Sequence, residues 1–444
     1  MTNQRIIWRL VAACAAVLAV VAAAFSASPA RAQTGSEFDN PSVLIQVNLS
    51  GAFNRWNTVV PDFLPLKPGG KTQAENQALP RRLGANLDMT GFFQLVDPRA
   101  SLESDPRAGL SDTAPLDYRP WAQIGASFVV KGGMEVSGSK LILELRLFDV
   151  ALGRQRLAKR YTGPVKDARK MINAFTNEIL LALTGEPGVF GSKIIFVTGA
   201  RENKGIMITE LGSDQAESLA APKNGPATQP TLGPGDRTAW IRRNGKKWEL
   251  VSNGRAVYSG QQVIAPAFMP NGTLVAGLSG PSSTNLAVFE GRQPRPLTNG
   301  GGIEISPTFS PDGSLMAYVS DRGGGLGLYV APSSGGPGTR ITASGKSSDP
   351  HWSPKGDKIV FVLRERDICV VNPDGSGLVQ LTSGQGHNYH PSFSPDGRMI
   401  VFESDRGGRS QLWVMSANGD RQQLLIPELT VSQSLPSWSP EMPN

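Results

Sequence analysis

The sequence predicts an α/β amino-terminal domain followed by an all-β six-bladed β-propeller, closed by the carboxy-terminal strand. A proline-rich motif repeats about every 41 residues in the second half, whereas helical and strand-like apolar patterns alternate in the first half. The 50 Gly and 34 Pro among 444 residues agree with this fold class, because many short strands need many turns. We place the boundaries at 1–32 for a signal peptide, 33–187 for the α/β domain and 188–444 for the propeller.

Residues 1–32 are typical of a secretory signal peptide. Arg5 and Arg9 precede the apolar run 10–25, and Ala30-Arg31-Ala32 provides the small residues at a cleavage site. The run is short for a bilayer span of about 20 residues, which favours cleavage over a membrane anchor. We therefore expect an exported mature chain from Gln33 with no membrane span.

The mature composition excludes several classes of protein. It has 41 Lys+Arg against 37 Asp+Glu, and its basic pairs are scattered, so nucleic acid is not an expected partner. Cys369 is its one cysteine, which excludes an internal disulfide. This residue lies in the apolar run Ile368–Val371, and we expect it to be a buried packing residue.

The first half carries signals of both helices and strands. A stripe of apolar residues at spacings of three and four predicts a helix over 172–183, ended by Gly185, and a similar pattern predicts one over 74–90. Short apolar or alternating runs predict strands at 43–47, 92–96, 127–130 and 141–148. These elements suit helices packed on a mixed sheet.

The second half is a repeat. Clear copies are 307–313, 350–356 and 391–397, weaker copies are 230–236 and 266–272, and a truncated copy is 436–440. The second prolines of the copies are 36, 41, 43, 41 and 45 residues apart. Each clear copy precedes two buried strands and a short fourth strand, which gives the four strands of a propeller blade.

The two ends of the array complement each other. Lys193–Val197 begins the array without a preceding motif, and the motif at 436–440 has no strands after it. We expect Ser437-Trp438-Ser439 to insert beside residues 193–220 and to close the ring, which would protect open sheet edges.

The sequence offers little for catalysis. It has no Gly-x-Ser-x-Gly nucleophile elbow, and its three histidines, His351, His387 and His390, have the wrong spacing for a helix-borne metal site even with Asp349 added. We expect no enzyme, metal or cofactor. Two alternatives stay open: a propeller hydrolase or lyase, and a propeller that binds peptidoglycan or sugar, for which Tyr389 is the one good aromatic candidate.

The remaining possibility is a binding surface. In a propeller, the connectors between one blade's last strand and the next blade's first strand converge on one mouth of the central channel, and loops on a rigid scaffold often carry recognition. We expect the connectors to end at 229, 265, 306, 349, 390 and 435. The candidate partner-binding residues at the mouth are Gln262, Glu304, Asp349, His387, His390 and Ser434.

The motif Pro-x-Phe/Trp-Ser-Pro-Asp-Gly resembles the repeats of the TolB family of the Tol–Pal system. The signal peptide, the small α/β domain, the junction 183–188 leading into 193–197, and the ending 436–440 also resemble that family, in the same order. The blade tips at 234–236, 270–272 and 354–356 depart from the motif, and these departures leave the blade count intact.

The resemblance implies a non-enzymatic periplasmic adaptor, which we expect to be a monomer. Proteins of this family bind the lipoprotein Pal at the channel mouth, and their mature amino-terminal segment engages TolA of the inner-membrane Tol complex. The system maintains outer-membrane integrity and draws that membrane inward at cell division. By position, the amino-terminal partner segment would be 33–40, with Gln33, Glu37, Asp39 and Asn40 as its candidate residues.

Overall fold

The computed structural model describes residues 55–67, 73–111, 113–199, 203–221, 225–291, 293–343 and 346–443. The expected signal peptide, the strand at 43–47 and the candidate residues Gln33, Glu37, Asp39 and Asn40 lie outside these residues. No helix in the described ranges is long and apolar enough to cross a membrane.

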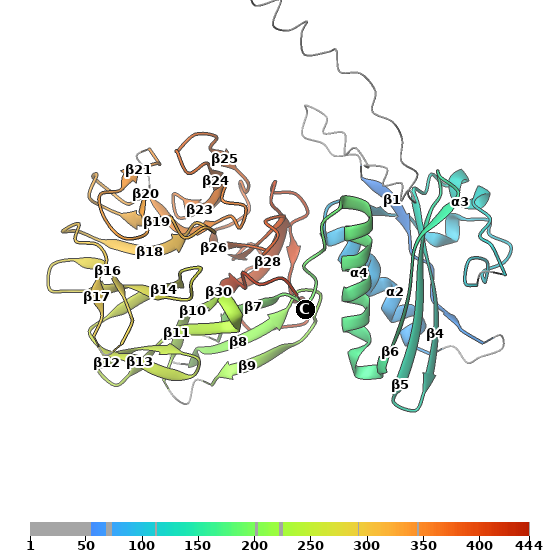
Figure 1. Cartoon of the computed structure of the whole chain (residues 1–444), viewed down its shortest axis with the longest axis horizontal. Coiled ribbons are helices and arrows are strands. Elements are labelled where there is room, and N and C mark those ends of the chain that lie inside the picture. Colours follow the sequence, from blue (N-terminus) through green and yellow to red (C-terminus); the bar gives the residue numbers. More distant parts are fainter. Residues whose placement is uncertain are drawn as a thin grey trace, which may run out of the picture. The chain divides into compact units, whose positions relative to one another are not determined.

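The first half forms a mixed six-stranded sheet (Figure 1). Its main order is β3-β1-β4-β5-β6, and β2 pairs with β4 beside that path. β1 is parallel to its neighbours β3 and β4, whereas β4, β5 and β6 form an antiparallel meander. The strands are β1 (Trp56–Val59), β2 (Leu64–Pro65), β3 (Phe93–Leu95), β4 (Phe128–Ser137), β5 (Lys140–Asp149) and β6 (Arg154–Pro164).

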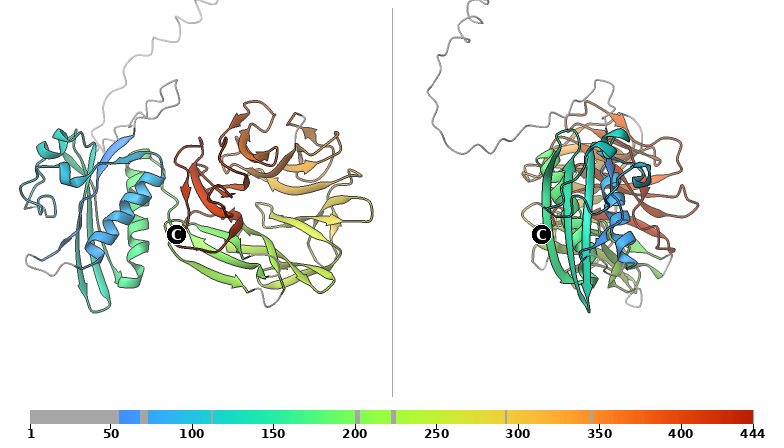
Figure 2. Two further views of the ribbon diagram at one scale, coloured as in Figure 1. Left: turned by 180° about the vertical axis from the view of Figure 1, so that it is seen from behind. Right: turned by 90° about the vertical axis from the view of Figure 1, so that its right-hand side faces the viewer.

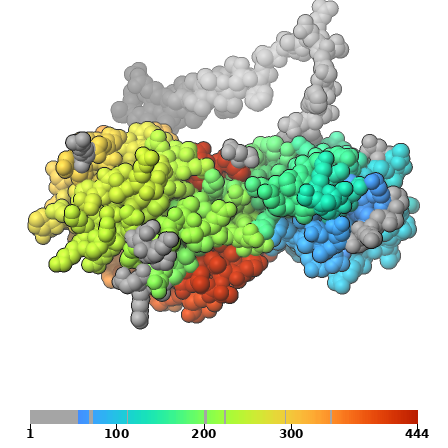
Figure 3. All heavy atoms as spheres, turned by 90° about the horizontal axis from the view of Figure 1, so that it is seen from below, coloured from blue at the N-terminus to red at the C-terminus, as the bar shows by residue number. Residues whose placement is uncertain are grey.

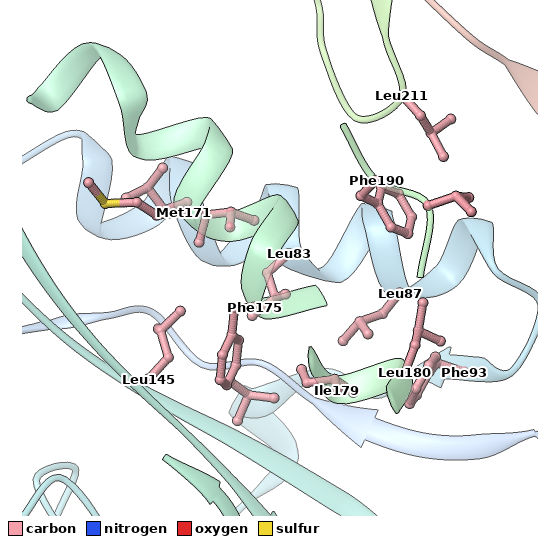
Figure 4. Close-up of a cluster of buried hydrophobic side chains, with 14 of the residues drawn as sticks. Leu83, Leu87, Phe93, Leu145, Met171, Phe175, Ile179, Leu180, Phe190 and Leu211 are labelled. Atoms are coloured by element: carbon pink, nitrogen blue, oxygen red, sulfur yellow. The ribbon is translucent and has the colours of Figure 1, made fainter. Parts of the chain in front are cut away.

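Two long helices, α2 (Glu75–Met89) and α4 (Ala168–Thr184), cover one face of this sheet (Figure 2). Their apolar stripes meet the sheet in a core that includes Leu83, Leu145 and Phe175 (Figure 4). α4 ends at Gly185, whose φ of 79° places it in the left-handed region where glycine is unstrained. The short helices are α3 (Arg119–Gln123) and the 3-10 turns η1 (Pro98–Ala100), η2 (Val165–Asp167) and η5 (Pro234–Asp236).

The two predicted helices and three of the predicted strands are confirmed within a residue or two at most ends. The sequence reading missed β1, β2, α3 and β6, and it ended the strand that begins at Phe128 seven residues early. β4 carries Lys131, Gly132 and Gly133 in its middle, so its apolar run is interrupted although the strand continues. β6 is an edge strand rich in charged residues, and only its pairing with β5 defines it.

The second half is a propeller of six four-stranded antiparallel sheets, as predicted (Figure 1). We number the blades along the chain, and blade one is the sheet that contains β7. In each blade the innermost strand lines the central channel. The strands are, for blade one, β30 (Gln433–Trp438), β7 (Lys193–Thr198), β8 (Gly205–Glu210) and β9 (Ala216–Ala220); for blade two, β10 (Ala227–Gly233), β11 (Arg237–Asn244), β12 (Lys247–Ser252) and β13 (Arg255–Gly260); for blade three, β14 (Val263–Phe268), β15 (Leu274–Ser279), β16 (Thr284–Val288) and β17 (Arg295–Pro296); for blade four, β18 (Glu304–Phe309), β19 (Leu315–Ser320), β20 (Gly327–Pro332) and β21 (Thr339–Arg340); for blade five, β22 (Ser347–Trp352), β23 (Ile359–Leu363), β24 (Asp367–Val371) and β25 (Val379–Gln380); and for blade six, β26 (Asn388–Phe393), β27 (Met399–Ser404), β28 (Gln411–Ser416) and β29 (Gln423–Leu424).

The repeated motif makes the turn between the first two strands of a blade. In blade four, the Ser310 hydroxyl donates to Asp312, and Gly313 has a φ of 72°, which explains the need for glycine there. Asp321 and Asp405, which recur between blades, accept backbone N–H groups from Ile303 and His387. These carboxylates therefore hold turns in place.

The carboxy-terminal strand closes the ring. β30 pairs antiparallel with β7 and becomes the innermost strand of blade one. Trp438 is 1% exposed, and its indole N–H donates to the hydroxyl of Ser192 at 2.8 Å. In the space-filling view, the red carboxy-terminal residues adjoin the green residues of blade one (Figure 3). The predicted closure is confirmed.

Candidate functional site

The innermost strands of the six blades surround a central channel with a cavity of about 600 Å³. We call the end of the channel where these strands begin the mouth, and the other end, which carries the proline-rich turns, the tip face. Each innermost strand contains a β-bulge at the residue before its first proline, where the pairing with the second strand shifts register. The six bulge residues are Gln229, Ala265, Ser306, Asp349, His390 and Leu435.

All six bulge residues are non-glycine residues in the left-handed region, with φ between 48° and 54°. That conformation costs an L-residue of order 1–2 kcal/mol, and such strain tends to accumulate at functional sites. The following proline lacks an N–H and cannot complete the ladder, so the bulge places it without breaking the strand. The result is a ring of side chains and backbone groups that line the channel.

The bulge positions correct one expectation. We expected the connectors to end at these six residues, but each innermost strand begins two residues earlier. The strands continue through the prolines because the bulge accommodates them. The bulge residues therefore line the channel from within strands, below the connectors of the mouth.

A cluster of ionisable side chains lies beside the channel between blades five and six. His390 Nδ1 lies 3.1 Å from Glu403 Oε2, and His390 Nε2 lies 3.7 Å from Asp349 Oδ1. Glu403 also accepts the N–H of the bulge residue Leu435 at 3.0 Å and the hydroxyl of Ser410. One imidazole therefore connects the carboxylates of two blades, and Glu403 extends the connection to the closing strand of blade one.

These contacts set the ionisation of the cluster. Burial alone would lower the pKa of His390, but the charges of Asp349 and Glu403 outweigh burial and raise it. Burial also opposes ionisation of Glu403, yet the hydrogen bond and charge of His390 lower the pKa of this carboxyl. The imidazolium form of His390 is thus favoured beside two carboxylates, while about a third of its side chain stays exposed.

An aromatic group borders this cluster at the mouth. The rings of His387 and Tyr389 are stacked with centroids 6.2 Å apart, and His387 Nδ1 lies 3.0 Å from Asp405. Burial, followed by the carboxylates of Asp405 and Glu403, raises the pKa of the Tyr389 phenol. Blades five and six therefore present stacked rings and ionisable groups side by side.

The structure separates the predicted mouth residues into three kinds. Asp349 and His390 come together as described, and His387 lies beside them. Gln262 is exposed in the connector before β14, and Ser434 is half-buried in β30. Glu304 was expected at the surface, but its side chain is 1% exposed, so it cannot offer itself to a partner there. It accepts the N–H of Gly300 and lies 3.8 Å from Arg322.

Glu403 was missed by the sequence reading. It lies on β27, the second strand of blade six, and pairs there with Tyr389, which stands two residues before the motif proline Pro391. The other blades place Val197, Ile241, Gly277, Val319 and Val362 at that position. A carboxylate where the repeat otherwise puts an apolar residue or glycine is the signal that could have found it.

Comparison with protein families matches both halves of the chain. Residues 48–156 match the TolB amino-terminal domain, and residues 181–442 match the TolB beta propeller domain. The chain belongs to the TolB family. Its predicted family resemblance is thereby confirmed.

Individual relatives agree with this membership. The Protein TolB homolog of Chlorobium luteolum is 34% identical over 389 residues, which are 84% of this chain and 88% of that protein. The Tol-Pal system protein TolB of Desulfosudis oleivorans is 35% identical over 68% of this chain and 52% of that protein. The crystal structure of TolB from Acinetobacter baumannii shares the fold, with a TM-score of 0.73 and 22% identity over 87% of this chain and 97% of that one.

No group of three or more His, Cys, Asp or Glu residues in the described ranges could hold a metal ion. His351 lines the channel, where its Nδ1 accepts the N–H of Phe393, and His387 Nδ1 lies 3.0 Å from Asp405. Histidine and carboxylates at the mouth therefore make ion pairs with one another.

Proposed function

We propose that this chain is a non-enzymatic periplasmic adaptor of the Tol–Pal system, and that the lipoprotein Pal binds over the mouth. The amino-terminal segment, including Gln33, Glu37, Asp39 and Asn40, would engage TolA of the inner-membrane Tol complex. Such an adaptor would act as a monomer and support outer-membrane integrity and invagination at cell division.

The observation that best supports this proposal is the cluster of Asp349, His390 and Glu403 in the ring of bulge residues. Its groups are held by contacts between three blades, so a partner would meet side chains that are already in position, which lowers the entropic cost of binding. Membership of the TolB family supports a Tol–Pal partner over any other protein at this surface.

The geometry of His390 favours binding over nucleophilic catalysis. A Ser-His-Asp mechanism needs a serine hydroxyl hydrogen-bonded to an imidazole nitrogen. Both nitrogens of His390 face carboxylates, and the nearby Ser410 hydroxyl binds Glu403 instead. The cluster therefore has an imidazole but no hydroxyl directed at either of its nitrogens.

The proposal is tested by titrating the soluble domain of Pal against the mature protein in a calorimeter. Replacing Asp349 and His390 together with alanine should weaken binding at least about tenfold, because truncated contacts at the centre of an interface cost more than about 1 kcal/mol. Asp374→Ala is a matched control, since Asp374 lies in an exposed turn on the tip face. No binding of Pal to the wild-type protein would contradict the proposal. Equal affinities of Pal for the wild type, the double variant and Asp374→Ala would show that the Asp349–His390–Glu403 cluster is not the binding site.

A further inference from the structure

Blade two carries an unusual charge. Residues 227–260 contain six Lys or Arg and two Asp or Glu, whereas residues 304–340 of blade four contain two basic and three acidic residues. The corresponding segment of blade six, 388–424, has four of each. Most of the excess in blade two lies in one hairpin, which we call the basic hairpin: Arg242, Arg243, Asn244, Gly245, Lys246, Lys247, Trp248 and Glu249.

The basic hairpin projects at the mouth. β11 has eight residues, whereas the second strands of the other blades have five or six. Its pairing with β10 ends where Ala227, the first residue of the innermost strand, faces Arg242. Beyond that point Arg243 still donates its N–H to the carbonyl of Pro226, and the following residue Asn244 pairs only with β12, so the tip of the hairpin extends past the start of the innermost strand.

Side-chain contacts within the hairpin hold Arg242, Arg243 and Glu249. Glu249 accepts two hydrogen bonds from Arg242 and one from Asn244, and its own side chain is 10% exposed. The guanidinium of Arg243 lies over the ring of Trp248, 5.6 Å from its centroid. Lys246 and Lys247 are exposed, and neither makes a salt bridge with any residue that the structure describes.

We propose that the basic hairpin is an electrostatic docking element for an acidic patch on the protein that binds over the mouth. The inference rests on the proposed function. It adds that the partner carries an acidic patch and that this patch faces blade two. Unpaired charges on a preformed projection accelerate association, because they attract a complementary surface before close contact is made. The Arg242–Glu249 ion pair neutralises its own charges and helps to fix the hairpin conformation. Lys246 and Lys247 provide the positive electrostatic potential that would attract the partner.

A protein partner fits this hairpin better than a lipid surface. Recognition of anionic lipid headgroups typically uses a cluster of four to eight basic residues. The hairpin offers two unpaired lysines and one stacked arginine, within reach of the mouth where the proposed partner binds. Binding to a membrane is therefore an outcome that the experiment must distinguish.

The test measures association rates of the soluble Pal domain with the mature protein by stopped flow, at 50 and 500 mM NaCl. Lys246→Glu combined with Lys247→Glu should slow association about tenfold at 50 mM, and the difference should fall below about twofold at 500 mM, because salt screens exposed charges. Arg255→Glu combined with Arg295→Glu changes the net charge equally, at exposed positions on the tip face of blades two and three, and should change the rate less than about twofold.

Each outcome has one meaning. If the lysine variant and the arginine control associate at the same rate, the hairpin is no docking element, even while Pal still binds over the mouth. If Pal does not bind the wild-type protein, the proposed function fails first. If the lysine variant associates normally with Pal but loses binding to vesicles of phosphatidylglycerol, the surface serves a membrane and the inference is wrong. Thermal melts of both variants near the wild-type value ensure that the comparison concerns folded proteins.

Discussion

Closure of the ring through β30 predicts that one tryptophan stabilises the whole propeller. Trp438 is 1% exposed, packs in the core of blade one, and donates its indole N–H to the buried hydroxyl of Ser192. Replacing it with alanine creates a cavity and leaves that hydroxyl without its donor, which should cost about 3–5 kcal/mol. For a propeller of about 250 residues, this corresponds to a melting temperature about 6–10 °C lower.

Differential scanning calorimetry of the mature protein measures this effect. Trp438→Phe retains most of the volume but loses the N–H, so we expect a smaller decrease of roughly 2–4 °C. Leu378→Ala is the control, because Leu378 is 56% exposed and its truncation should cost less than about 0.5 kcal/mol. An unchanged melting temperature for Trp438→Ala would refute the view that β30 closes a cooperative ring.

Two further predictions concern buried titratable groups. Burial lowers the pKa of His351 to about 4, so the stability of the neutral ring is complete above pH 6.5 and is lost as the pH falls through 4. His351→Gln, which can still accept the N–H of Phe393, should therefore lose less melting temperature than wild type between pH 7 and pH 4.5; an equal loss would refute this role. Burial also raises the pKa of the Cys369 thiol to about 11, so Ellman's reagent at pH 8 should modify it only after unfolding in guanidinium chloride. Rapid modification of the native protein would show that Cys369 is accessible.

The blades were predictable because their signal is repeated and chemical. A proline with a preset φ and a glycine with a positive φ, as at Pro311 and Gly313, mark the same turn in each copy. Ring closure was predictable because the array lacks an innermost strand at one end and carries a spare one at the other. Both conclusions depend on counting units along the chain, which needs no knowledge of contacts in space.

The candidate site was predictable only in part. Asp349 and His390 were predicted because the repeat aligns them. Their contact with each other could not be predicted, because it depends on two β-bulges in neighbouring blades. The burial of Glu304 was not predicted because it becomes visible only in the folded chain, where Arg322, 18 residues later, lies 3.8 Å away. Glu403 was not predicted because it lies on the second strand β27, outside the repeated proline motif of the innermost strands.

Closure by β30 also has a consequence for the order in which the propeller can form. Trp438 and its partner Ser192 are 246 residues apart, so blade one cannot be completed until almost the entire propeller sequence is available. Until then β7 has an open inner edge, able to pair with other chains. The chain therefore passes through a long stage of folding in which an unpaired strand edge is exposed, and chaperones that cover such edges would have their greatest effect on its yield at that stage.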